Sequence, residues 1–124
     1  MTQPLALVLY EKLLPGTQLV NRLQDMNYRV QAIKDAALLV QCAEQVKPMV
    51  VLADLESTRT NVCQAIAQLR LNPATQHLPV IGFGVDGNAA LESQGKAAGV
   101  NLIASDAALL NHLPQLLEQA LHIE

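Results

Sequence analysis

The chain has 124 residues, 51% of them hydrophobic, which is enough apolar material for one domain with a single core. Eight Lys and Arg residues stand against eleven Asp and Glu, and the cations are scattered singly, so the clustered positive charge that binds nucleic-acid phosphates is missing. No stretch approaches the roughly 20 apolar residues of a membrane span, and the N-terminus lacks a signal-peptide pattern. We therefore expect a cytoplasmic protein that binds neither nucleic acid nor membrane.

The first part of the chain predicts a strand, a helix and a second strand. Residues 5–10 form a continuous apolar run, as a strand that is buried on both faces should. Pro15-Gly16 is expected to break the chain before a first helix, whose core face carries Leu19 and Leu23. Residues 28–33 alternate in part, which predicts a strand nearer the edge of a sheet.

The middle of the chain repeats this order. Asp35 is predicted to cap a second helix, which ends at Lys47-Pro48 because proline cannot extend a helix. Residues 49–54 are apolar and then abruptly acidic, which predicts a third, buried strand that ends at Asp54. A third helix follows, and Asn72-Pro73 ends it.

The last two strands are predicted at residues 79–84 and 101–104. A short helix rich in alanine, residues 88–98, lies between them, and Gly99 is expected to be the C′ residue that closes it.

The last helix carries a proline and a wide leucine face. Pro114 is tolerated only in a first turn, so Asn111 is predicted as the N-cap and residues 107–110 as a loop. The leucines are Leu109, Leu110, Leu113, Leu116, Leu117 and Leu121. They indicate either a closing helix that is buried within the domain or a surface for a homodimer or partner.

Strict alternation of five strands with five helices predicts a fold of the α/β class. We expect a doubly wound, five-stranded parallel sheet of the flavodoxin-like type, in one domain over residues 1–124. Functional residues in such folds lie at the carboxyl ends of the strands, near the point where the strand order reverses. The positions at those ends are Tyr10, Glu11, Asp54, Gly84, Ser105 and Asp106.

Three segments resemble the receiver domain of two-component response regulators. Residues 49–54 resemble the strand that ends in the phosphorylated aspartate, and residues 71–81 resemble the passage through a proline-containing loop into strand four. Residues 98–100 resemble the Ala-Gly-Ala that precedes strand five. The resemblance covers nearly the whole chain, and it implies a (βα)5 receiver-like fold and a role in two-component signalling.

The resemblance also implies which residues would carry phosphoryl transfer. In receivers a pair of acids after strand one helps to hold Mg²⁺, and this pair falls on Tyr10 and Glu11. The phosphoacceptor falls on Asp54, and the Thr or Ser that contacts the phosphate falls on Gly84. The lysine that offsets the phosphate charge falls on Asp106, or on Ser105 if the loop is one residue shorter.

The departures from that pattern predict a pseudo-receiver, which is not an enzyme, needs no cofactor and acts by contact with a protein partner in a signalling pathway. Asp54 is then a strand-end acid that caps the following segment, and Glu11 with Asp54 could hold a cation only weakly. Two alternatives remain: a receiver that is phosphorylated on Asp54 with Mg²⁺, and a domain that binds a small ligand.

Overall fold

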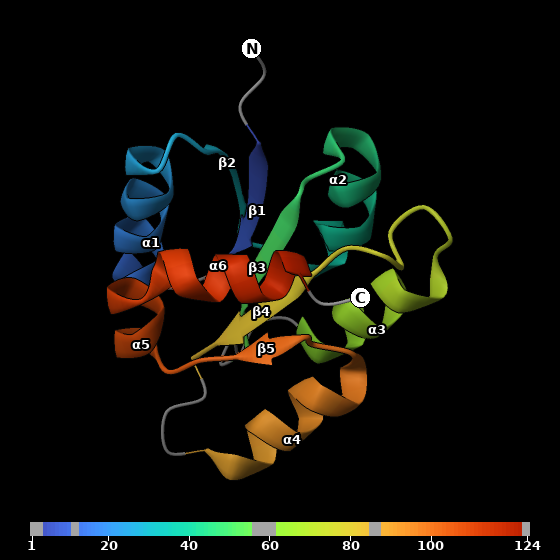
Figure 1. The fold of residues 1–124 in the computed structure, drawn as a ribbon. Coiled ribbons are helices and arrows are strands. Elements are labelled where there is room, and N and C mark those ends of the chain that lie inside the picture. Colours follow the sequence, from blue (N-terminus) through green and yellow to red (C-terminus); the bar gives the residue numbers. More distant parts are fainter. Residues whose placement is uncertain (1–3, 11–12, 56–61, 85–87, 123–124) are drawn as a thin grey trace.

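The computed structural model describes residues 4–10, 13–55, 62–84 and 88–122. Its five strands are β1 (Leu5–Leu9), β2 (Arg29–Ile33), β3 (Val50–Asp54), β4 (Val80–Phe83) and β5 (Leu102–Ile103). They form one sheet with the order β2-β1-β3-β4-β5, and every neighbouring pair is parallel (Figure 1). The predicted α/β class and five-stranded parallel sheet are confirmed.

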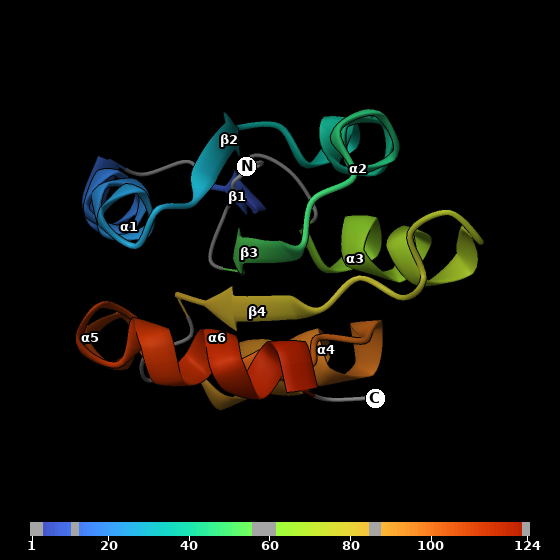
Figure 2. The same cartoon turned by 45° about the horizontal axis from the view of Figure 1, so that its top comes forward.

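Helices cover both faces of the sheet. They are α1 (Leu13–Asp25), α2 (Leu39–Val46), α3 (Val62–Leu71), α4 (Ala89–Ala98), α5 (Asp106–Asn111) and α6 (Leu113–His122), and a 3-10 turn, η1 (Ala36–Leu38), precedes α2. Figure 2 separates α1 and α5 on one side from α2 and α3 on the other. Two apolar clusters match this division, because one contains residues of α2 and α3 and the other residues of α1, α5 and α6. The sheet is therefore doubly wound, as predicted.

The burial of the strands follows their place in the sheet. All residues of β3 and β4 are buried, which explains why the sequence runs there are continuously apolar. β2 lies at one edge, and only its last residue, Ile33, is buried. The partial alternation of residues 28–33 was therefore a correct sign of an edge strand.

Two predicted helix ends are confirmed by hydrogen bonds and backbone angles. The Asp35 carboxylate accepts a hydrogen bond of 2.9 Å from the Ala37 amide and so caps η1, which leads directly into α2. Gly99 ends α4 with a φ of 111°, a left-handed conformation that glycine adopts without the steric cost of a Cβ.

Two predictions about helix starts are wrong. Pro15-Gly16 does not break the chain but lies in the first part of α1, where a missing amide hydrogen costs nothing because the first turn leaves its amides unpaired. Residues 107–110 are not a loop: they belong to α5, and Ser105 is the cap, with its hydroxyl accepting from the Ala108 amide at 3.1 Å. Asn111 is the last residue of α5, and Pro114 stands in the first turn of the separate helix α6.

Within the part of the chain that the structure describes, no helix has both the length and the apolar character needed to cross a bilayer.

Candidate functional site at the carboxyl edge of the sheet

The strand order brings the predicted site positions to one edge of the sheet. Leu9 pairs with Ala53, and Asp54 pairs with Phe83, so the chain leaves β1, β3 and β4 at the same level. The order reverses between β1 and β3, which is where open α/β sheets bind their ligands. Ser105 and Asp106 reach this edge from β5 at the start of α5.

Asp54 ends β3 as a buried carboxylate. Only 3% of its surface is exposed, and among the described residues it is one of two buried polar residues, with Thr75. Its neighbour Leu55 extends the ladder by donating its amide to the Phe83 carbonyl at 2.9 Å. Asp54 also interacts within the protein, so it is not a free acid that awaits a ligand.

Gly84 and Asp106 are joined by a hydrogen bond. The Gly84 amide donates to Oδ1 of Asp106 at 3.0 Å, which ties the end of β4 to the first residue of α5. Gly84 has a φ of 78°, where a residue with a Cβ is strained, so the backbone itself requires glycine here. The carboxylate of Asp106 also lies at a helix N-terminus, where the helix dipole favours negative charge.

This bond changes the chemistry of the edge. Gly84 is the position where the resemblance implies a hydroxyl, and Asp106 is one of the two positions, with Ser105, where it implies a lysine; the Gly84 amide and the Asp106 carboxylate engage each other. Ser105 does not supply the missing hydroxyl to the edge, because its Oγ is occupied as the N-cap of α5. None of the described site positions, Tyr10, Asp54, Gly84, Ser105 and Asp106, carries a cation for an incoming phosphate, and the described cation at this edge is Lys34, which follows the edge strand β2.

The position of the first predicted acid holds a tyrosine that packs into the core. Tyr10 is 9% exposed and belongs to the apolar cluster beneath α1, α5 and α6, while its amide donates to the Ile33 carbonyl at 3.1 Å. Glu11 lies outside the described residues, so the predicted cation pair of Glu11 and Asp54 stays a prediction. Among the described residues, no three His, Cys, Asp or Glu side chains gather as a metal site would require.

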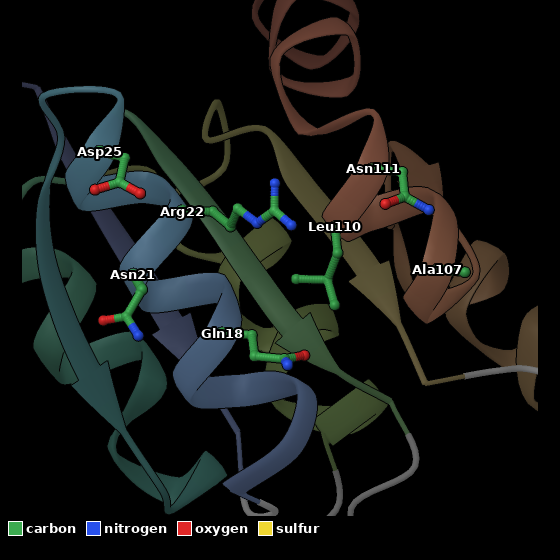
Figure 3. Close-up of a pocket in the computed structure, with 7 residues that line it drawn as sticks. All are labelled: Gln18, Asn21, Arg22, Asp25, Ala107, Leu110 and Asn111. Atoms are coloured by element: carbon green, nitrogen blue, oxygen red, sulfur yellow. The ribbon is translucent and has the colours of Figure 1, made fainter.

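A polar depression of about 480 Å³ lies between α1 and α5. Figure 3 shows the Arg22 side chain reaching across the gap between the two helices toward Leu110, with Gln18 below it. The lining is Gln18, Asn21, Arg22, Asp25, Ala107, Leu110 and Asn111. This depression was not predicted from the sequence, because its α5 side consists of Ala107 and Leu110, which were predicted to lie in a loop, and Asn111, which was predicted as an N-cap.

Most of the described leucines near the C-terminus are buried in the domain's own core. Leu109, Leu113 and Leu117 are buried, and Leu110 and Leu116 are partly buried against the same cluster. The described large apolar side chains that are exposed are Leu38, Met49 and Leu71, and these belong to other elements. A buried closing helix accounts for the described leucines, and a homodimer through this helix stays a prediction.

Comparison with known proteins identifies the fold through structure and not through sequence. No family model matches the chain, and no curated protein matches it. The receiver domain of a sensor histidine kinase from Pseudomonas aeruginosa, solved with magnesium in its active-site cleft, superposes with a TM-score of 0.88 at 17% identity, covering 98% of this chain and 100% of that one. A putative response regulator from Chloroflexus aurantiacus gives 0.82 at 16% identity, covering 94% and 99%.

A third solved structure agrees with these two. The response regulator domain of CheB from Thermotoga maritima gives a TM-score of 0.81 at 17% identity and covers 99% of each chain. The chain therefore has the flavodoxin-like fold of response-regulator receiver domains.

Proposed function

We propose that this domain is a pseudo-receiver: a two-component-type signalling module that acts through contact with a partner protein and does not carry an aspartyl phosphate. It has no catalytic turnover of its own. The observation that carries the proposal is the hydrogen bond from the Gly84 amide to the Asp106 carboxylate. The resemblance implies a hydroxyl at Gly84 and a lysine at Asp106 or Ser105, and none of these residues is cationic.

The physical reason is charge. Phosphorylation of an aspartate replaces a carboxylate of charge −1 with an acyl phosphate of about −1.5 to −2 charges at neutral pH, and receivers offset this charge with Mg²⁺ and a lysine. Like charges 5–7 Å apart repel by about 2–3 kcal/mol at an effective dielectric constant near 20. A carboxylate at Asp106 would therefore put a repulsion where a lysine supplies an attraction, which disfavours the phosphorylated state.

The missing hydroxyl removes the usual conformational response as well. A receiver senses its phosphate when the hydroxyl after strand four moves to contact it, and the surface around helix four is reshaped. Gly84 has no side chain to make that contact, and Asp106 already occupies its amide. The interaction surface of this domain is then constitutive, or it is controlled by the partner.

The alternative is a receiver that is phosphorylated on Asp54 with Mg²⁺. Two observations favour it: Asp54 is retained as the last residue of β3, and the Pseudomonas aeruginosa receiver with the same fold holds magnesium. Binding of the metal by this chain would depend on Glu11 and Asp54.

Beryllofluoride with Mg²⁺ separates the two functions, because it mimics the phosphoryl group on a competent aspartate. We expect the amide NMR spectrum to be unchanged around Asp54 and Gly84, and acetyl phosphate to add no phosphate to the intact mass. A receiver with the complete set of site residues, treated in parallel, serves as the positive control. Shifts that saturate with beryllofluoride and vanish in Asp54→Asn would establish the alternative.

A further inference from the structure

A second depression lies at the opposite edge of the sheet, where the strands begin. It has a volume of about 470 Å³, within the range of ligand-binding clefts, and residues from the starts of β1 and β2 and from the segments before β3 and β4 line it. It is thus separated from Asp54 and Gly84 by the length of the strands.

The lining of this depression is cationic. It contains Arg29, Lys47 and His77, and no Asp or Glu is among its lining residues. This is notable in a chain with a net charge of −3 and only eight Lys and Arg residues. Arg29 also has an interaction within the protein, so the exposed Lys47 carries the charge on which the argument depends, and the exposed His77 adds an imidazole that can hydrogen-bond to a carboxylate.

An exposed apolar side chain lies among these cations. Met49 is 47% exposed and is one of three large apolar side chains that are exposed in the described part of the chain. A flexible thioether adapts to apolar groups of different shape, which suits it to contact with a partner side chain. The depression therefore combines positive charge with one apolar contact.

The backbone around the depression is held in place before anything binds. The Met49 amide donates to the Leu5 carbonyl at 2.8 Å, and the Val51 amide donates to the Pro79 carbonyl at 2.9 Å. Pro4, Pro48 and Pro79 also line it, and each proline fixes one backbone angle.

The loop that carries His77 is fixed from both sides by a single side chain. Nη1 of Arg70 donates to the carbonyls of Gln76 and Leu78, at 2.8 and 2.6 Å. A site that is already ordered loses little conformational entropy when a ligand binds.

We propose that this cationic depression binds an extended acidic segment of a partner protein, with carboxylates near Lys47 and His77 and an apolar side chain against Met49. Electrostatic complementarity of this kind sets the specificity and association rate of protein contacts. Arg29 and Lys47 are too few cations for a nucleic acid or an anionic membrane, which bind clustered cations, and the lining offers no aromatic ring for base stacking. An acidic protein segment fits better, because it can place a carboxylate near Lys47 and an apolar side chain against Met49 in the same shallow site.

The test uses a short, fluorescein-labelled peptide of alternating Glu and Leu and the full chain. We expect saturable binding by fluorescence anisotropy, with amide NMR shifts at Lys47, Met49 and His77. The double variant Lys47→Glu/His77→Glu should weaken binding about tenfold, the order expected when two carboxylates introduced beside an acidic peptide each cost a few-fold. Met49→Ser should weaken binding a few-fold, and raising the salt from about 0.05 to about 0.5 M should also weaken it.

Matched controls make the result decisive. Lys34→Glu reverses an exposed cation that follows β2 at the other edge, and it should leave the affinity unchanged. Asp54→Asn should also bind normally, so this experiment succeeds or fails independently of the proposed function. Equal loss in Lys34→Glu, shifts confined to the α1–α5 depression, or binding of an oligonucleotide or anionic vesicles in place of the peptide would each overturn the proposal.

Discussion

Replacing Arg70 with alanine should lower the free energy of unfolding by about 2–4 kcal/mol. The guanidinium makes five hydrogen bonds to oxygen atoms on two segments. Nε and Nη2 donate to the Gly99 carbonyl at 3.0 and 2.7 Å, and Nη2 also donates to Oδ1 of Asn101 at 2.6 Å. Nη1 donates to the carbonyls of Gln76 and Leu78. One side chain thus fastens the approach to β5 to the approach to β4.

The size of this expected loss of stability depends on which oxygen atoms would lose their hydrogen-bond donor. The bonds to Gly99 and Leu78 are partly buried, and an unsatisfied buried carbonyl costs about 1–3 kcal/mol. Gln76 is exposed and can bond to water, and Asn101 keeps its bond from the Val80 amide, so these two add little. Burial also lowers the pKa of the Arg70 guanidinium, because desolvation disfavours its charged form. The alanine variant does not bear this desolvation cost, so its loss of stability is smaller than the hydrogen bonds alone would give.

Urea unfolding followed by circular dichroism measures this difference. We expect a lower midpoint with an unchanged slope, and a smaller loss for Arg70→Lys, which keeps the charge without the planar fork. Arg22→Ala, at an exposed position on α1, is the matched control and should change stability by less than about 0.5 kcal/mol. If Arg70→Ala falls within the same limit, the hydrogen bonds do not stabilise the fold and the reasoning is wrong.

Three further predictions concern glycines and thiols. Gly99→Ala should destabilise the protein by about 1–3 kcal/mol in the same urea assay, since φ is +111° and the new Cβ would lie 2.8 Å from Cγ of Arg70. Gly84→Thr should cost about 1–2 kcal/mol because of its positive φ, and mass spectrometry should still find no phosphate after acetyl phosphate treatment. Burial raises the pKa of the Cys42 and Cys63 thiols, so their neutral forms are favoured in the folded state. That stabilisation is present below pH 9.0, the ordinary thiol pKa, and is lost as the pH rises above it. Urea unfolding between about pH 8 and 10 should therefore show a steeper loss of stability for the wild type than for a Cys42→Ser/Cys63→Ser variant.

The strands could be predicted from the sequence because the burial of each strand determines its pattern of apolar residues. β3 and β4 are buried on both faces and read as unbroken apolar runs, while the edge strand β2 alternates. The helix starts were harder, since a proline has opposite meanings in the first turn and in the interior of a helix. Pro15 and Pro114 were both judged on local pattern, and only the position of each first turn decides which meaning applies.

The candidate site residues were predicted from their positions at the ends of strands, but the hydrogen bond between Gly84 and Asp106 was not predicted. Gly84 and Asp106 are 22 residues apart, and their hydrogen bond depends on a left-handed backbone angle that a lone glycine in the sequence does not reveal. Arg70 was taken as one of several scattered cations for a similar reason. Its acceptors are mainly backbone carbonyls, which every residue carries, so no residue pattern marks them.

The two edges of the sheet also differ in charge in a way that only the strand order exposes. Residues 47 and 77 are 30 positions apart, but both precede strands that are neighbours in the sheet, β3 and β4. Since parallel strands begin at one edge, Lys47 and His77 come together there, while Asp54 and Asp106 lie at the other edge, which Lys34 also reaches after β2. The two proposals share this basis: we propose that the acids at the carboxyl edge disfavour a phosphate there, and that Lys47 attracts carboxylates to the edge where the strands begin.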